Sequence, residues 1–151
     1  MPAQALDSLS AETGHGTRDV GLWRLGASWR QHPEFLKDTR WSLHWEATVG
    51  GWHGDLGTVH DVGVTPVWRY ARYGRGMYFE GAIGFHILSD SHINSDLGFS
   101  TRFQFGDHLG VGYRFEKYDF GLRLQHLSNG GMRNPNPGIN FLILRVARDL
   151  K

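Results

Sequence analysis

The sequence predicts an all-β protein, an eight-stranded antiparallel transmembrane β-barrel with a polar interior. Apolar and polar residues alternate with a period of two along most of the chain, which is the pattern of strands with two different faces. Glycine accounts for 21 of 151 residues and aromatic residues for 13%, a bias typical of chains with many short strands. No stretch approaches the ~20 apolar residues that a membrane helix requires, so a membrane span could only be made of strands.

The alternation is carried by segments of about ten residues, a length that suits a tilted transmembrane strand. In the second segment, for example, Trp41 and Trp45 share one face, whereas His44 and Glu46 share the other. In the last segment, Arg145 on the polar face places Asn140, Leu142, Leu144 and Val146 on the apolar face. The expected strands are 23–30, 41–50, 62–70, 77–87, 99–105, 109–116, 120–125 and 139–149.

The length of the chain fits a single domain. Residues 1–18 are polar and lack the apolar core of a signal peptide. We therefore expect them to form an N-terminal segment outside a barrel made of residues 19–151. The expected tight turns are 70–76 and 115–118, with a bulge or turn at 105–109, and the expected longer polar loops are 32–40, 51–56, 88–97 and 129–138.

Bulky aromatic residues, Phe99 among them, gather on one face of the segments, and charged residues gather on the other. The charged face carries Glu46, Glu80 and several arginines, including Arg102 and Arg123, which can fill a narrow lumen as ion pairs. The aromatic face then meets lipid, with rings near the strand ends at the membrane interface. A soluble barrel that encloses an apolar pocket is the alternative interpretation of the same alternation.

Composition argues against other classes of protein. The formal net charge is only +1, and lysine and arginine form no dense tract, so we expect no nucleic-acid partner. The chain has no cysteine, and its histidines lack the spacing of metal ligands on one strand face. We therefore expect neither a metal site nor another cofactor.

The seventh segment ends in two polar residues on its apolar face. Phe120, Leu122 and Leu124 lead on that face to His126 and Ser128, because side chains two apart on a strand point the same way. Polar groups on a lipid-facing surface are costly and tend to be functional, and a histidine beside a serine can activate its hydroxyl. If the N-terminus is periplasmic, this segment ends at the extracellular rim, level with the outer leaflet and its lipopolysaccharide.

The residues around this pair form a motif. His-Leu-Ser-Asn at 126–129 is followed by two glycines and by Asn-Pro-Asn-Pro-Gly at 134–138, and Phe-Gly-Asp-His-Leu-Gly precedes it at 105–110. Over roughly the last third of the chain, this resembles the PagL-type lipid A 3-O-deacylases. The resemblance implies a hydrolase of the bacterial outer membrane, with a Ser-His-acid site on the outer face of an eight-stranded barrel.

The resemblance assigns roles to individual residues. Ser128 would be the nucleophile and His126 the general base. The acidic position of the family falls on Asn140, and this is a departure, because a neutral amide can orient a histidine but cannot stabilise the imidazolium by charge. Either Asn140 serves as a weaker orienting group or another residue, such as Asp107, supplies the acid.

Ester hydrolysis also needs hydrogen-bond donors aimed at the oxyanion. Asn129 and the backbone N–H groups of Gly130 and Gly131 are close in sequence to Ser128, and the resemblance points to the same region. Asn136 is a further candidate, although asparagines flanked by prolines are also typical of plain turns.

We therefore expect an esterase that removes the 3-O-linked acyl chain of lipid A in the outer leaflet, as a monomer or homodimer. The alternative is a non-enzymatic outer-membrane barrel with a structural or adhesive role, in which His126 and Ser128 are ordinary rim residues. Glu46 and Glu80 could suggest a catalytic carboxylate pair, but interior ion pairing is the simpler interpretation, with His44 and His86 in the same network.

Overall fold

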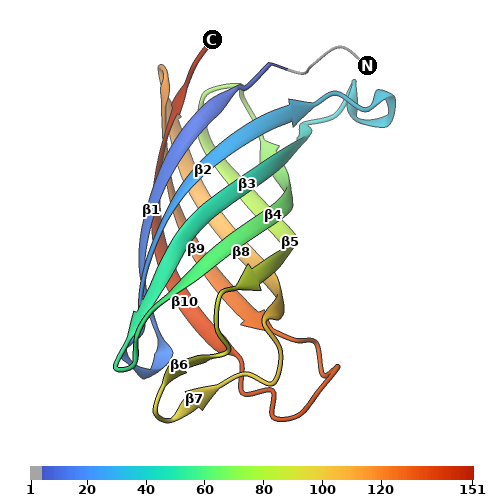
Figure 1. The fold of residues 1–151 in the computed structure, drawn as a ribbon. Coiled ribbons are helices and arrows are strands. Elements are labelled where there is room, and N and C mark those ends of the chain that lie inside the picture. Colours follow the sequence, from blue (N-terminus) through green and yellow to red (C-terminus); the bar gives the residue numbers. More distant parts are fainter. Residues whose placement is uncertain (1–4) are drawn as a thin grey trace.

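A computed structural model describes residues 5–151, and its strands close into an eight-stranded antiparallel barrel (Figure 1). The predicted fold class is confirmed. Around the barrel the order is β1-β10-β9-β8-β5-β4-β3-β2, and β6 and β7 form a separate two-stranded sheet. Among the described residues, no helix is long and apolar enough to cross a membrane. The strands are β1 (Ser8–Gly16), β2 (Gly21–Gln31), β3 (Trp41–Gly54), β4 (Gly57–Ala71), β5 (Gly76–Leu88), β6 (His92–Asn94), β7 (Leu97–Gly98), β8 (Phe103–Phe115), β9 (Tyr118–Ser128) and β10 (Ile139–Asp149).

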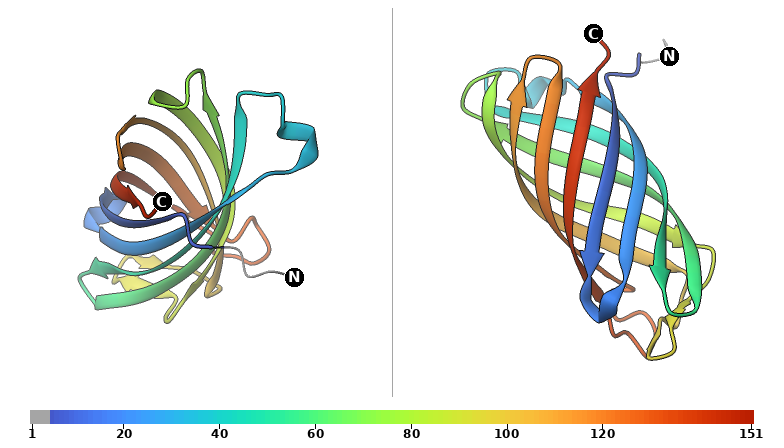
Figure 2. Two further views of the ribbon diagram at one scale, coloured as in Figure 1. Left: turned by 90° about the horizontal axis from the view of Figure 1, so that it is seen from above. Right: turned by 90° about the vertical axis from the view of Figure 1, so that its left-hand side faces the viewer.

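The two ends of the barrel differ. The start of β1 and the end of β10 lie at one end, together with the β2–β3, β4–β5 and β8–β9 connections (Figure 2). The opposite end, called here the site rim, carries the 3-10 turn η1 (Thr17–Asp19), the β3–β4 turn, the β6–β7 hairpin and the loop 129–138. A second short 3-10 turn, η2 (Glu34–Leu36), lies in the β2–β3 connection.

Three predicted boundaries are wrong. The expected loop 51–56 is mostly strand, because β3 runs to Gly54 and β4 begins at Gly57. Residues 1–18 do not lie outside the barrel, because Ser8–Gly16 forms β1 and pairs with both β2 and β10; residues 1–4 of that predicted segment fall outside the described part of the chain. The expected strands 99–105 and 109–116 merge into β8, so the expected turn at 105–109 is continuous strand. The sequence pattern did not indicate β1 as a strand, because its inward face is made of serine, glycine and a single glutamate, Glu12.

The faces of the barrel follow the predicted alternation. Trp23, Trp41, Phe79 and Phe85 are exposed on the outside, where a membrane barrel presents aromatic and aliphatic side chains to lipid. Two assignments are corrected: Phe99 is buried and Arg102 is exposed, because both precede β8 in the long β5–β8 connection and do not follow the strand period.

Charged side chains fill the part of the lumen nearer the chain termini. Arg123 donates hydrogen bonds to Glu12 at 2.6 Å, to Glu80 at 2.6 Å and to Glu46 at 3.0 Å. Arg69 pairs with Glu80 at 2.9 Å. The interior ion pairing expected for Glu46 and Glu80 is confirmed. Each of these charges is compensated in place, which is the condition for burying it without a large penalty.

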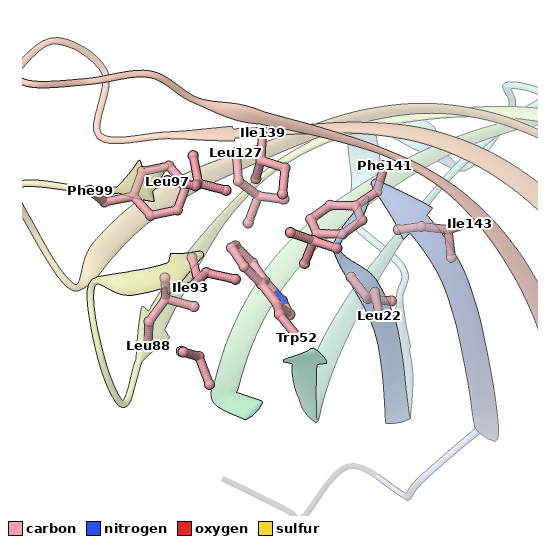
Figure 3. Close-up of a cluster of buried hydrophobic side chains, with 12 residues drawn as sticks. Leu22, Trp52, Leu88, Ile93, Leu97, Phe99, Leu127, Ile139, Phe141 and Ile143 are labelled. Atoms are coloured by element: carbon pink, nitrogen blue, oxygen red, sulfur yellow. The ribbon is translucent and has the colours of Figure 1, made fainter. Parts of the chain in front are cut away.

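Apolar side chains fill the lumen below the site rim and form a plug (Figure 3). Trp52 lies near its centre and packs edge-on against Phe141, with ring centroids 5.2 Å apart. The β6–β7 hairpin contributes Ile93 and Leu97, which are both fully buried. The plug consists of Val20, Leu22, Trp52, Val59, Leu88, Ile93, Leu97, Phe99, Leu127, Ile139, Phe141 and Ile143.

Polar contacts hold the rim turns over this plug. The backbone N–H of Asp55 donates to Asn94 Oδ1 at 2.8 Å, and Asn94 Nδ2 donates to the carbonyl of Arg18 at 2.6 Å. Ser95 donates to Asp55 from its hydroxyl at 2.6 Å and from its backbone at 2.8 Å. These hydrogen bonds hold the pKa of the Asp55 carboxyl below its usual range. Three separate connections are thereby joined at the site rim.

Candidate active site

The end of β9 places two polar side chains on the outer surface of the site rim. His126 and Ser128 are partly exposed and continue the outward row of Leu122 and Leu124. Leu127, between them, points inward and is fully buried in the plug. The predicted orientation of the pair is therefore confirmed by the strand's burial pattern.

His126 is held by a neighbour on β10. The two strands pair so that Asn140 lies directly opposite His126, and His126 Nδ1 lies 2.7 Å from Asn140 Oδ1. Because an amide oxygen can only accept, Nδ1 donates in this contact and Nε2 is left with its lone pair. The backbone N–H of Asn140 is itself bonded to Thr17 Oγ1 at 3.3 Å, a link from η1 that the sequence did not suggest.

A glycine packs against the ring of the histidine. Gly138 has φ +62°, and a Cβ added there would lie 2.7 Å from His126 Cε1 and 3.2 Å from Nε2. Only a residue without a side chain fits this approach. Gly138 therefore leaves room for the imidazole in the position where it meets Asn140.

Asp107 flanks His126 on the opposite side from Asn140. The β8–β9 register sets Asp107 directly across from His126, and Asp107 is exposed on the outer face. Its facing was open in the sequence, and the structure places it in the same outward row as the candidate site. Within residues 5–151, its carboxylate makes no hydrogen bond or ion pair.

Ser128 is the last residue of β9, at the edge of the site rim, and lies opposite Phe105 of β8. Its Oγ accepts a long hydrogen bond of 3.4 Å from the backbone N–H of Gly130. Gly130 and Gly131 both have positive φ, at +66° and +78°, so the chain turns sharply directly after the serine. The hydroxyl is thus placed where a strand gives way to a loop.

Asn129 is buried and supports this loop from below. Its Nδ2 donates to Ser100 Oγ at 3.0 Å and to the carbonyl of Arg133 at 2.7 Å, and its Oδ1 accepts from the Gly131 N–H at 2.9 Å. The Asn129 N–H donates to Asn136 Oδ1 at 3.0 Å. The side chain of Asn129 and the N–H of Gly131 therefore already have partners inside the protein. Asn136, by contrast, is only partly buried, and its Nδ2 group donates to no other described residue. Ser100 was not singled out in the sequence, because nothing there relates position 100 to this loop.

The same rim offers no metal site of the usual composition. Across residues 5–151 there is no group of three or more histidine, aspartate and glutamate side chains able to hold an ion. The groups gathered at this rim are the hydroxyl of Ser128, the imidazole of His126, the amides of Asn136 and Asn140 and the carboxylate of Asp107.

An eight-stranded barrel with an apolar outer belt and a serine–histidine pair facing outward at its rim defines the class of outer-membrane barrel hydrolases. The sequence matches the family described as lipid A 3-O-deacylase (PagL) over residues 23–148. The chain belongs to this family, and it is an outer-membrane enzyme of the lipid A deacylase class. The soluble barrel and the non-enzymatic structural or adhesion barrel are thereby excluded as alternatives.

Individual relatives agree with this assignment. Lipid A deacylase PagL of Pseudomonas aeruginosa (strain PAO1) is 32% identical over 145 residues, covering 91% of this chain and 82% of that protein. Its counterpart from Bordetella bronchiseptica is 35% identical over 89 residues, which span 58% of this chain and about half, 49%, of that protein.

Solved structures give the same answer for the fold. The crystal structure of the outer membrane enzyme PagL has a TM-score of 0.82 at 27% identity and covers 93% of this chain and 98% of that chain. The N-terminal β-barrel domain of Pseudomonas aeruginosa OprF has a TM-score of 0.63 at 17% identity, with 97% and 98% covered. The second match is a likeness of fold alone.

Proposed function

We propose that this protein removes the 3-O-linked acyl chain of lipid A by a serine–histidine mechanism, with Ser128 as nucleophile and His126 as general base. The observation that carries the proposal is the 2.7 Å contact between His126 Nδ1 and Asn140 Oδ1, which fixes the imidazole on the same outward face as Ser128. This contact leaves Nε2 as the acceptor for the serine proton.

The reaction follows from these groups. Ser128 Oγ attacks the ester carbonyl carbon as His126 Nε2 takes its proton, and a tetrahedral oxyanion forms. When the bond to the sugar oxygen breaks, His126 returns the proton to that oxygen, and the acyl chain stays on Ser128. Water then attacks the acyl-enzyme, again with His126 as base. A free fatty acid is released and the Ser128 hydroxyl is restored.

The oxyanion requires donors that are not already committed. The Asn129 side chain and the Gly131 N–H have internal partners, so these two expected donors are better suited to holding the loop in place. The Nδ2 group of Asn136 and the N–H of Gly130, whose bond to Ser128 Oγ is long at 3.4 Å, are the donors we assign to the oxyanion. Such donors stabilise charge only where they are positioned beforehand, which the internal hydrogen bonds of Asn129 favour.

The outward position of the pair supports a substrate that arrives within the membrane. Leu124, next to His126 on the outer row, is 65% exposed, as expected for a lipid-facing residue. With the chain termini on the periplasmic side, the site rim lies level with the outer leaflet, where lipid A resides. A lipid of this leaflet can then bring its ester bond to Ser128 by lateral diffusion, without entering the lumen.

Replacement of Ser128 by alanine tests the nucleophile. Ser128→Ala should fold as a barrel but leave lipid A fully acylated, and mass spectrometry of lipid A from cells that produce the variant reads the loss or retention of the 3-linked chain. Ser42→Ala on β3, which is also a partly buried strand serine, is the matched control and should deacylate normally. Deacylation by the Ser128→Ala variant would contradict the proposal.

A further inference from the structure

Asp107 is a charged side chain in an apolar setting. It points outward from β8, and its outward neighbours Leu109 on the same strand, Ile83 on β5 and Leu124 on β9 are 73%, 63% and 65% exposed. A carboxylate among lipid-facing side chains is costly and requires a functional explanation. No described residue compensates it with a hydrogen bond or an ion pair.

Asn140, on the other flank of His126, orients the imidazole but carries no charge. In a serine–histidine hydrolase, the imidazole becomes an imidazolium in the transition state, and a nearby anion stabilises it. The hydrogen bond to Asn140 keeps the correct tautomer of His126 but leaves this positive charge unbalanced. A second group on the open flank of the ring can supply the balance.

We propose that Asp107 supplies this negative charge through space, so that orientation and charge, which one acid would combine, are divided between Asn140 and Asp107. The inference rests on the proposed function of Ser128 and His126. The register sets Asp107 opposite His126, and side chains so placed on one face have Cβ atoms about 5 Å apart. Asp107 makes no hydrogen bond to the ring, so it acts as a positioning charge and takes no part in proton transfer.

The surroundings strengthen this interaction. A charge pair close to lipid is screened much less than one in bulk water, and the apolar neighbours of Asp107 provide that environment. On β10 the groups nearest the ring are uncharged. Among the described residues, the site rim near β8 and β10 also carries His15, Arg18, Asp19, Asp96, Arg102 and Arg133. His15 pairs with Asp19 at 3.5 Å and Arg18 with Asp96 at 3.4 Å.

A double-mutant cycle between the two flanks tests the proposal. The variants are Asp107→Asn, Asn140→Glu and the combination, each purified in detergent and assayed on lipid A over a range of pH. Asp107→Asn alone should lower kcat by about tenfold, the equivalent of one pKa unit of lost charge stabilisation. Asn140→Glu places an anion directly on Nδ1 and should raise kcat. In that background Asp107→Asn should cost less than about threefold, because the charge is then supplied elsewhere.

The pH profile separates an electrostatic role from a structural one. An electrostatic role predicts that the acid limb of kcat/KM moves to lower pH in Asp107→Asn, whereas a purely structural role leaves it in place. Asp19→Asn is the matched control, because it removes an exposed carboxylate from the same rim; asparagine also tolerates the backbone φ of 56° at that position. This control should leave both kcat and the acid limb unchanged.

Three results would overturn the inference. One is an Asp107→Asn variant with unaltered kcat. Another is an equal loss in both backgrounds, with a raised KM and an unmoved acid limb, which would mean that Asp107 contacts the substrate instead. The third is an equal effect of Asp19→Asn. Failure of the proposed function is recognised separately, by deacylation that persists in Ser128→Ala whatever Asp107 does.

Discussion

The two halves of the lumen are filled in opposite ways. Toward the chain termini, buried arginines and carboxylates form a connected network around Arg123. Below the site rim, the lumen holds the plug around Trp52 and Leu127. Both halves fill the same narrow barrel. The first does so with directed ionic contacts, and the second with packed apolar side chains, which Figure 3 shows.

The difference concerns what each half supports. The network bridges β1, β3, β5 and β9 through charges whose partners are fixed, so it specifies which strands face one another. The plug lies on the lumenal side of β9, behind His126 and Ser128. It includes Ile93 and Leu97 of the β6–β7 hairpin. It supports the site with close-packed side chains, and a close-packed interior transmits small displacements to the strand that carries His126 and Ser128.

Removal of the central cation should produce the largest effect. Arg123→Met leaves Glu12, Glu46 and Glu80 buried with less compensation, and we expect a loss of about 3–5 kcal/mol in the free energy of unfolding. Tryptophan fluorescence during urea unfolding in lipid vesicles measures it. Arg18→Met is the control, because Arg18 is exposed and its pair with Asp96 should contribute less than about 1 kcal/mol. Equal losses in the two variants would contradict the importance of the network.

Truncation in the plug should cost somewhat less stability but affect the site more. Leu127 is fully buried between His126 and Ser128, the two proposed catalytic residues. Leu127→Ala should therefore lose about 3 kcal/mol of unfolding free energy by the cavity it leaves, and kcat should fall. Leu124→Ala on the same strand is the control, because that side chain is 65% exposed. A Leu127→Ala enzyme with unchanged kcat would show that the plug does not position the site.

The smallest change in stability is expected at the site rim itself. Gly138→Ala introduces positive-φ strain of about 1–2 kcal/mol and places a Cβ 2.7 Å from His126 Cε1. The imidazole should therefore move and lose its hydrogen bond to Asn140, and kcat should fall at least about tenfold. Gly76→Ala, with φ +88° and nothing within 4 Å of the added Cβ, carries the strain without the contact. Equal activities of the two variants would show that Gly138 does not set the position of the ring.

The membrane-facing surface and the ionic half of the lumen could be predicted because both follow the strand period. Glu46, Glu80 and Arg123 were expected inside and lie there, and the outward row that ends in His126 and Ser128 followed from the same alternation. The departure at Asn140 was visible in the motif, and the structure adds its contact with His126.

The plug and the first strand could not be predicted, because neither shows a clear alternation of polar and apolar residues in the sequence. Ile93, Leu97 and Phe99 reach the lumen from the β5–β8 connection, the first two in the short β6–β7 hairpin, where no long strand period relates neighbouring side chains. The inward residues of β1 are mostly small, so its two faces look alike in the sequence. The partners of Asn129 and the fit of Gly138 against His126 depend on loop geometry, which emerges only when distant segments meet.

The filled lumen has a consequence for the traffic of reactants. In the described part of the chain, apolar side chains fill one end of the lumen and ion pairs fill the other. Under the proposed function, the lipid and the hydrolytic water therefore both reach Ser128 from the outer surface of the barrel. Turnover is then confined to the boundary between two phases. The rate at which the enzyme meets its substrate depends on how densely the lipid covers the surface and how fast it diffuses within that plane.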